Sequence, residues 1–183
     1  MVILTLIALI GIELSSWLVT GITILETGGL LYIIWIARAG LADLPARLPE
    51  MMPSIDLSSL SMIVLGAFLA FYAFIGFEDL ANTAEELKNP KRDMPRAIVI
   101  MMIVATILYL LVALVAVLGL PLETLQASEK PLALLYEQTT GKSPIIISLI
   151  SLFSVMNGIL VQIIMASRLM YGMADKQRLP KFL

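Results

Sequence analysis

The chain alternates long apolar stretches with short polar segments, and the apolar stretches are long enough to cross a lipid bilayer. A transmembrane helix takes about 20 apolar residues. The pattern therefore predicts transmembrane helices over residues 16–37, 60–87, 97–120 and 144–173. Residues 1–12 are apolar but too few to span, so we expect a partial helix there, in a fragment that begins partway through that helix.

Prolines and capping residues refine these limits. Asp93 and Pro95 predict a capped start for the third span, and Ser143 and Pro144 do the same for the fourth. Pro90 predicts the end of the preceding helix, because the residue before a proline is disfavoured in the α region.

Composition supports an integral membrane protein. The chain is 60% hydrophobic and 14% charged, with a mean hydropathy of +0.97. A net charge of -2 gives no case for nucleic-acid binding. Without cysteine or histidine, disulfides, zinc–thiolate sites and histidine general-base catalysis are excluded. We expect no enzyme activity, no metal site and no cofactor.

The basic residues beside the spans predict an orientation. Residues 88–96 and 168–183 carry eight lysines and arginines, against four in the segments between the other span ends. Positive residues favour the cytoplasmic side. We therefore expect the protein in the cell's inner membrane, with residues 88–96 and 168–183 in the cytoplasm. Residues 39–59 and 121–142 are then external, with a short amphipathic surface helix over 131–140.

The second span contains a glycine followed closely by acids at membrane depth. Residues 57–77 carry no charge, and Gly76 is followed by Glu78 and Asp79 well before the next basic residue, Lys88. The middle of the span then falls near Tyr72. Solute transporters build binding sites where a helix is interrupted near the midplane, because the break exposes backbone groups.

Two acids within the spans are candidates for proton coupling. Glu26 lies at the middle of the first span, where an ionised carboxylate is costly unless it is protonated, paired or facing a polar cavity. It either lines the transport pathway as a proton- or cation-responsive group or is protonated and hydrogen-bonded between helices. Glu78 either exchanges a proton as the solute passes or ties the broken helix to its neighbours; we favour the first.

Other residues of the spans have simpler interpretations. Phe74 and Phe77 are expected to pack against neighbours or lipid, and Tyr72 is the better candidate for a gate. Gly28-Gly29 predicts close helix packing. Asn157 is expected to make an interhelical hydrogen bond.

Two motifs carry a family resemblance. Residues 71–98, FYAFIGFEDLANTAEELKNPKRDMPRAI, closely resemble the sixth helix and following cytoplasmic loop of amino acid permeases in the amino acid/polyamine/organocation (APC) superfamily. Residues 167–175, SRLMYGMAD, followed by Leu179-Pro180, resemble the end of that family's eighth helix and its loop. The resemblance covers essentially the whole chain, as helices four (partial) to eight.

The resemblance implies an all-α integral membrane protein with a partial leucine-transporter-like fold, whose first and sixth helices are unwound around the substrate. It places substrate contacts at Tyr72, Ala73, Ile75 and Gly76, with an aromatic residue, matched by Tyr72, closing over the substrate. It associates Glu78 with proton-linked gating. Glu26 departs from the pattern, since several proton-coupled members carry lysine at that position.

The sequence therefore predicts a secondary active amino acid permease, working by proton symport or amino acid exchange. Its partners would be an amino acid, the lipid bilayer and protons. The alternatives are a transporter-like amino acid sensor or partner subunit, and a non-functional truncated remnant.

Overall fold

The structure is a computed structural model that describes residues 12–52, 54, 56–76 and 87–175. Every regular element in these residues is helical, which confirms the expected all-α class. In chain order the helices are α2 (Ile12–Ala37), η1 (Arg38–Asp43), α3 (Leu44–Met51), α4 (Leu57–Tyr72), α6 (Pro90–Gly119), α7 (Leu122–Ala127), α8 (Pro131–Thr140) and α9 (Ile145–Asp175).

Three helices of the described chain are long and apolar enough to cross a membrane. They coincide largely with α2, α6 and α9, which have 26, 30 and 31 residues. At about 1.5 Å per residue they are roughly 39 to 46 Å long, more than the roughly 30 Å of hydrocarbon in a bilayer. α4 is also apolar but has only 16 residues, so it reaches about 24 Å.

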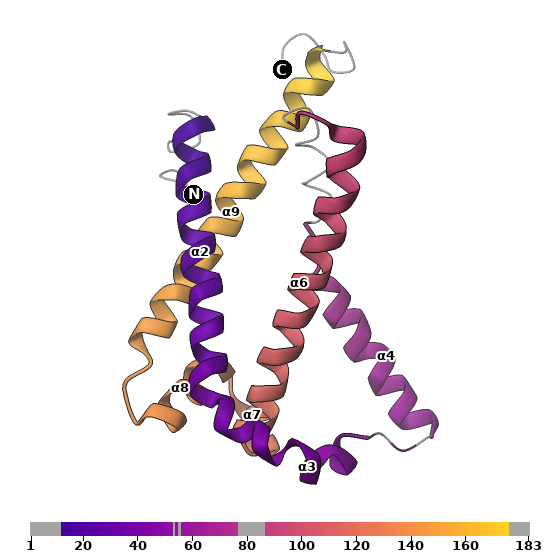
Figure 1. Ribbon diagram of the computed structural model, residues 1–183, viewed down its shortest axis with the longest axis vertical. Coiled ribbons are helices and arrows are strands. Elements are labelled where there is room, and N and C mark those ends of the chain that lie inside the picture. The colour runs from indigo at the N-terminus through magenta and orange to yellow at the C-terminus, as the bar shows by residue number, and fades with distance from the viewer. Residues whose placement is uncertain (1–11, 53, 55, 77–86, 176–183) are drawn as a thin grey trace.

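The helices form two groups of ends (Figure 1). The first residues of α6 and the last residues of α9 lie at one end of the molecule, and η1, α3, α7 and α8 lie at the other. The buried core is at this second end, where α2, α6, α8 and α9 meet. Its most enclosed side chains are Ile33, Val115, Leu120 and Leu135.

Arg47 links the segment between α2 and α4 to the core. Its guanidinium Nη1 donates to the carbonyl oxygens of Val117 (3.3 Å) and Leu118 (3.2 Å). These carbonyls belong to the last turn of α6, whose final carbonyls have no partner within the helix. A cation there also complements the helix dipole.

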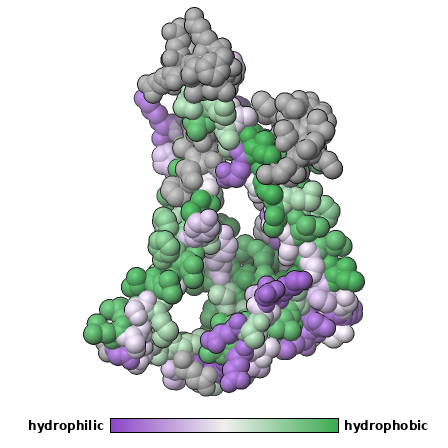
Figure 2. All heavy atoms as spheres, turned by 180° about the vertical axis from the view of Figure 1, so that it is seen from behind, coloured by the Kyte–Doolittle hydropathy of each residue, from purple (hydrophilic) through white to green (hydrophobic). Residues whose placement is uncertain are grey.

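Outside this core, large apolar side chains are exposed along the helices. In Figure 2 apolar side chains cover much of the visible face, and most of the hydrophilic ones gather near its lower end. Phe68, Ile103 and Val155 are each more than half exposed. Apolar surface on this scale is typical of helices that face lipid or other helices in a membrane.

α4 diverges from the other helices. It has no buried residue, and Figure 1 shows it separating from α6 toward its first residues. Its last turn returns to α6, where the Tyr109 hydroxyl contacts the backbone. The end of α4 is therefore held in place by α6.

Several helix limits differ from those expected from the sequence. α6 begins at Pro90 and not at residue 97. Proline is well suited to the first position of a helix, because a backbone N–H there would have no acceptor within the helix. Pro95 lies inside that helix. α4 begins at Leu57 and α2 at Ile12. The expected partial helix over 1–12 falls almost entirely outside the described residues, as does the part of the second span after Gly76, up to residue 86.

Segment 39–59 was expected only as an external linker, yet most of it is helical. η1 and α3 occupy residues 38–51. Pro45 lies in the first turn of α3, where a missing N–H costs no helical hydrogen bond. The prolines therefore do not prevent a short helix here.

Candidate functional site

The helical hydrogen-bond pattern of α4 changes at Ala73. The N–H groups of Ala73, Phe74 and Ile75 donate three residues back, to the carbonyls of residues 70, 71 and 72, at 3.1, 3.0 and 3.2 Å. This tighter pattern is common where a helix ends. Gly76 follows with a φ of 113°, a conformation that only glycine adopts readily. The described helix thus ends in a turn over residues 73–76.

Tyr109 of α6 fixes this turn in space. Its hydroxyl donates to the carbonyl oxygen of Ala73 at 3.0 Å, and its ring meets Phe74 edge-on, with centroids 5.3 Å apart. Tyr109 lies about 15 Å along α6 from Gly119. The turn therefore lies beside the interior of α6, away from its last residue.

The structure brings together the four residues expected to contact substrate. Tyr72, Ala73 and Ile75 are exposed, and Gly76 is half-buried. Tyr72 is 71% exposed and Ile75 53% exposed, so the described residues cover neither side chain. Phe77, Glu78 and Asp79 lie outside the described residues.

The start of α4 is fixed by a carboxylate cap. Asp56 Oδ1 accepts the backbone N–H of Ser59 at 2.6 Å and the hydroxyl of Ser58 at 2.9 Å. Its Oδ2 accepts the hydroxyl of Ser54 at 2.8 Å. The Ser59 N–H, followed by these hydroxyls, lowers the pKa of Asp56 because each hydrogen bond favours the ionised form.

A second polar group lies between α2 and α9. Asn157 is only 6% exposed, and its Nδ2 donates to Glu26 Oε1 and to Thr23 Oγ1, both at 3.2 Å. The Asn157 Oδ1 atom is buried and has no hydrogen-bond partner in the described part of the chain. We call these three residues the polar triad.

The polar triad lies near the middle of the two helices that carry it. Glu26 lies about 16 Å along α2 from Ala37, and Asn157 lies about 18 Å along α9 from Ile145. Glu26 is half-buried. Its described partner is a neutral amide and not a cation.

Close packing of α2 and α9 accompanies this contact. A Cβ atom on Gly29 would lie 3.1 Å from Ile150 Cδ1 and 3.2 Å from its Cγ2. The close approach expected of the glycine pair is therefore confirmed at Gly29. At Gly28 a Cβ atom would meet no described atom within 4 Å, so the prediction stays open there.

Sequence reasoning found some of these residues and missed others. The interhelical hydrogen bond of Asn157 is confirmed. An interhelical hydrogen bond was one of the two interpretations of Glu26, but Asn157 was not identified as its partner. Tyr109 was missed altogether. The available signal was a phenol hydroxyl deep in an apolar span, because such a group usually finds a partner.

Metal binding has no support among the described residues. They contain no group of three or more acidic side chains positioned to hold an ion. The turn at residues 73–76 instead offers backbone groups beside aromatic side chains. The polar triad offers one carboxylate, Glu26, hydrogen-bonded to a neutral amide.

Comparison with known proteins identifies a family. The family model described as Amino acid permease matches residues 1–183. The chain is 30% identical over 133 residues to an uncharacterized protein of Methanocaldococcus jannaschii, covering 72% of this chain and 31% of that protein. It is 28% identical over 153 residues to the branched-chain amino acid permease BcaP of Bacillus subtilis, covering 82% and 32%.

A shorter match links the chain to plant transporters. It is 43% identical over 58 residues to a vacuolar cationic amino acid transporter 4 of Arabidopsis thaliana, covering 32% of this chain and 10% of that protein. The chain spans about a third of the length of the archaeal and Bacillus relatives. No solved structure matches it. The family match confirms the resemblance found in the two sequence motifs.

Proposed function

This chain belongs to the amino acid permease family, a family of transporters, and from that premise we propose that it is part of a secondary active transporter of amino acids. The transporter moves its substrate by alternating access, coupled either to protons or to exchange of one amino acid for another. The observation that carries the proposal is the turn that ends α4 at residues 73–76, directly after a long apolar stretch.

The interrupted backbone supplies the substrate contacts. Carbonyl oxygens that no longer bond within a helix are acceptors for the α-ammonium group of an amino acid. We assign this role to the carbonyls of Tyr72, Ala73 and Ile75, with Gly76 allowing the turn. The Tyr72 and Ala73 carbonyls each accept one hydrogen bond, from the Ile75 N–H and the Tyr109 hydroxyl, and each keeps a second lone pair for the substrate. The exposed Tyr72 ring closes over the bound molecule, because it adjoins the turn and is free to change rotamer.

The substrate we propose is a neutral, apolar amino acid. The exposed side chains around the turn, Phe71, Tyr72 and Ile75, are apolar or aromatic. A hydrophobic surround favours an apolar side chain on the ligand. The name of the Bacillus relative, a branched-chain amino acid permease, agrees with this choice.

We assign proton coupling to Glu78 and Glu26. Glu78 follows Gly76 closely in the sequence, so a change in its charge acts beside the substrate. Glu26 has a neutral interhelical partner, Asn157. Proton loss or gain at Glu26 therefore changes the contact between α2 and α9.

The orientation we propose places residues 88–96 and 168–183 in the cytoplasm and the protein in the cell's inner membrane. The excess of lysine and arginine in these segments supports this side. The beginning of α6 and the end of α9 lie at the same end of the molecule (Figure 1), as this orientation requires.

The experiment is uptake of radiolabelled amino acids by proteoliposomes that contain the full-length protein, with and without an inward proton gradient. The matched variants are Glu26→Gln and Glu78→Gln, which keep side-chain size and remove the titrating group. We expect the gradient to accelerate uptake of apolar amino acids and at least one variant to lose that acceleration.

Other outcomes separate the alternatives. Uptake that ignores the gradient but requires amino acid inside the vesicle indicates an exchanger. Substrate binding without any flux contradicts the transporter proposal and supports a sensor or partner subunit.

A further inference from the structure

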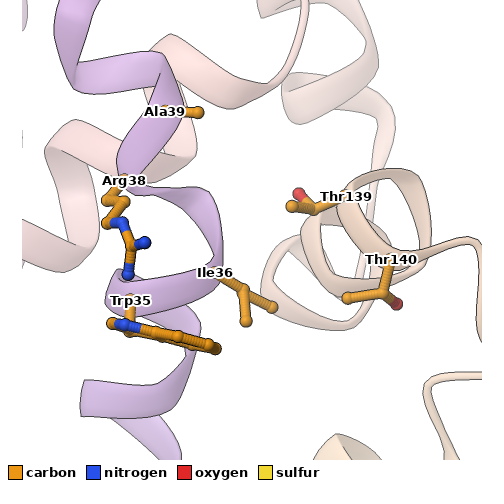
Figure 3. A pocket seen from close by; sticks show the side chains of 6 residues that line it. All are labelled: Trp35, Ile36, Arg38, Ala39, Thr139 and Thr140. Atoms are coloured by element: carbon orange, nitrogen blue, oxygen red, sulfur yellow. The ribbon is translucent and has the colours of Figure 1, made fainter.

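A hollow lies between the end of α2 and α8, away from the two sites described above. It has a volume of about 330 Å³ and is lined by Trp35, Ile36, Arg38, Ala39, Thr139 and Thr140. Figure 3 shows the Arg38 side chain extending over Trp35, with Thr139 and Thr140 on α8 across the hollow.

Arg38 is a cation that the described chain leaves unneutralised. Its guanidinium carbon lies 4.8 Å from the centre of the Trp35 ring. Within the described residues it has no hydrogen bond or ion pair, and it is exposed. Stacking on an aromatic face fixes the guanidinium plane and leaves its N–H groups free at the edge, where they match an oxyanion in bidentate geometry.

Aromatic residues place the hollow at the lipid–water boundary. Tyr32 stacks on Trp35 with ring centres 6.2 Å apart and meets Tyr136 of α8 at 6.3 Å. Trp35 is 58% exposed and Tyr32 44% exposed, close to the last residue of α2. Tyrosine and tryptophan at the end of an apolar span are typical of the membrane interface.

The lining chemistry distinguishes between anions. The hollow combines one cation with hydroxyl groups, and none of its described lining residues is acidic. A free amino acid is zwitterionic, and its ammonium group would lie near the Arg38 guanidinium with no carboxylate in this lining to neutralise it. A phosphodiester carries one negative charge and no cation of its own.

We propose that this hollow binds the headgroup of an anionic phospholipid such as phosphatidylglycerol. Arg38 pairs with the phosphate, Thr139 donates a hydroxyl hydrogen bond to the headgroup, and the exposed face of Trp35 lies against the acyl–glycerol region. Because the lipid contacts both α2 and α8, it joins the two helices at the outer end of the molecule. This site is independent of amino acid transport.

The test is lipid retention by the full-length protein in detergent, measured by native mass spectrometry. The ligands are phosphatidylglycerol, phosphatidylcholine and water-soluble glycerol 3-phosphate. The variants are Arg38→Gln and, as a matched control from the same end of the molecule, Lys130→Gln. We expect retention of phosphatidylglycerol over phosphatidylcholine, about tenfold weaker binding in Arg38→Gln, the equivalent of one charge-assisted contact, and no change in Lys130→Gln.

Three results would overturn the proposal. They are equal binding of the two lipids, unchanged phosphatidylglycerol binding in Arg38→Gln, and displacement of lipid by equimolar glycerol 3-phosphate, which would indicate a free-anion site. If Arg38→Gln does not fold, Arg38→Lys and Thr139→Ala replace it. Each is expected to weaken phosphatidylglycerol binding severalfold, and unchanged binding in both contradicts the site.

Discussion

Tyr109 connects the interrupted end of α4 to the long helix α6. Its hydroxyl takes the place of a helical N–H at the Ala73 carbonyl, 3.0 Å away, and its ring supports Phe74. One residue therefore both positions the turn and partly satisfies its backbone.

Tyr109→Phe removes that hydrogen bond and retains the ring contact. We expect substrate affinity to fall about two- to tenfold, corresponding to roughly 0.5–1.5 kcal/mol for one neutral hydrogen bond, because the turn becomes less fixed. Equilibrium binding of the transported amino acid measures the effect. A Tyr109→Phe protein with wild-type affinity would show that the hydroxyl does not position the site.

Asp56 gives a pH-dependent start to α4. Its pKa is lowered by the Ser59 N–H and the hydroxyls of Ser54 and Ser58. A depressed folded-state pKa means that the stabilisation is present above the ordinary value of about 4 and is lost as the pH falls through the lowered value. We therefore expect the amides in the first turn of α4 to lose protection against hydrogen exchange as the solution is acidified, after correction for the intrinsic exchange rate.

Asp56→Asn is the matched control for this prediction. The amide oxygen still caps the helix, since asparagine is a good N-cap residue, but it does not titrate. Protection of the amides in residues 57–60 should then be independent of pH after correction for intrinsic exchange. Identical pH dependence in the two proteins would argue against the carboxylate cap.

At the scale of elements, the contact between α2 and α9 combines the polar triad with a glycine. Both helices approach closely because Gly29 has no side chain to meet Ile150. The Asn157 hydrogen bonds then form along the same pair of helices.

Gly29→Val tests this packing. The added side chain overlaps Ile150, and overpacking of this kind costs about 1–3 kcal/mol. Gly28→Val is the control, because its Cβ atom meets nothing within 4 Å. Thermal unfolding of the full-length protein should show a loss in the first variant, a smaller change in the second and partial recovery on adding Ile150→Ala. Equal losses in the two valine variants would contradict the close approach.

The helices and their contacts also show which structural features could be predicted from the sequence. Apolar length and the glycine at Gly76 were enough to predict long helices and a change of backbone direction at Gly76, since both depend on local composition. The pairing of Asn157 with Glu26 depends on how α2 and α9 pack, and no local pattern encodes it. α3 was not predicted, because the prolines of this segment indicate a linker. Pro45 lies in the first turn of α3, a position that tolerates proline.

At the scale of the whole molecule, two sets of helix ends face opposite sides of the membrane in the proposed orientation. The chain contains no cysteine, so single cysteines report on each side. Lys91 and Lys142 are exposed and lie at opposite ends of the proposed topology.

Lys142→Cys should react with a membrane-impermeant maleimide in intact cells, and Lys91→Cys should react only after permeabilisation. The physical reason is the excess of positive charge around Lys91, which favours retention in the cytoplasm. The reverse labelling pattern would invert the topology. Labelling of both from outside would mean that the charge bias does not set the orientation.

The central claim is that the turn after α4 is the transport site, and amino acid uptake by Gly76→Ala and Gly66→Ala tests it most directly. Both changes add one methyl group to the same segment, but Gly76 has a φ of 113° that alanine disfavours. Gly66 lies inside the helix, and a Cβ atom there meets nothing. We predict that proteoliposomes with full-length Gly76→Ala lose most uptake while Gly66→Ala matches the wild type. Wild-type uptake by Gly76→Ala, or equal loss in both variants, would contradict the account.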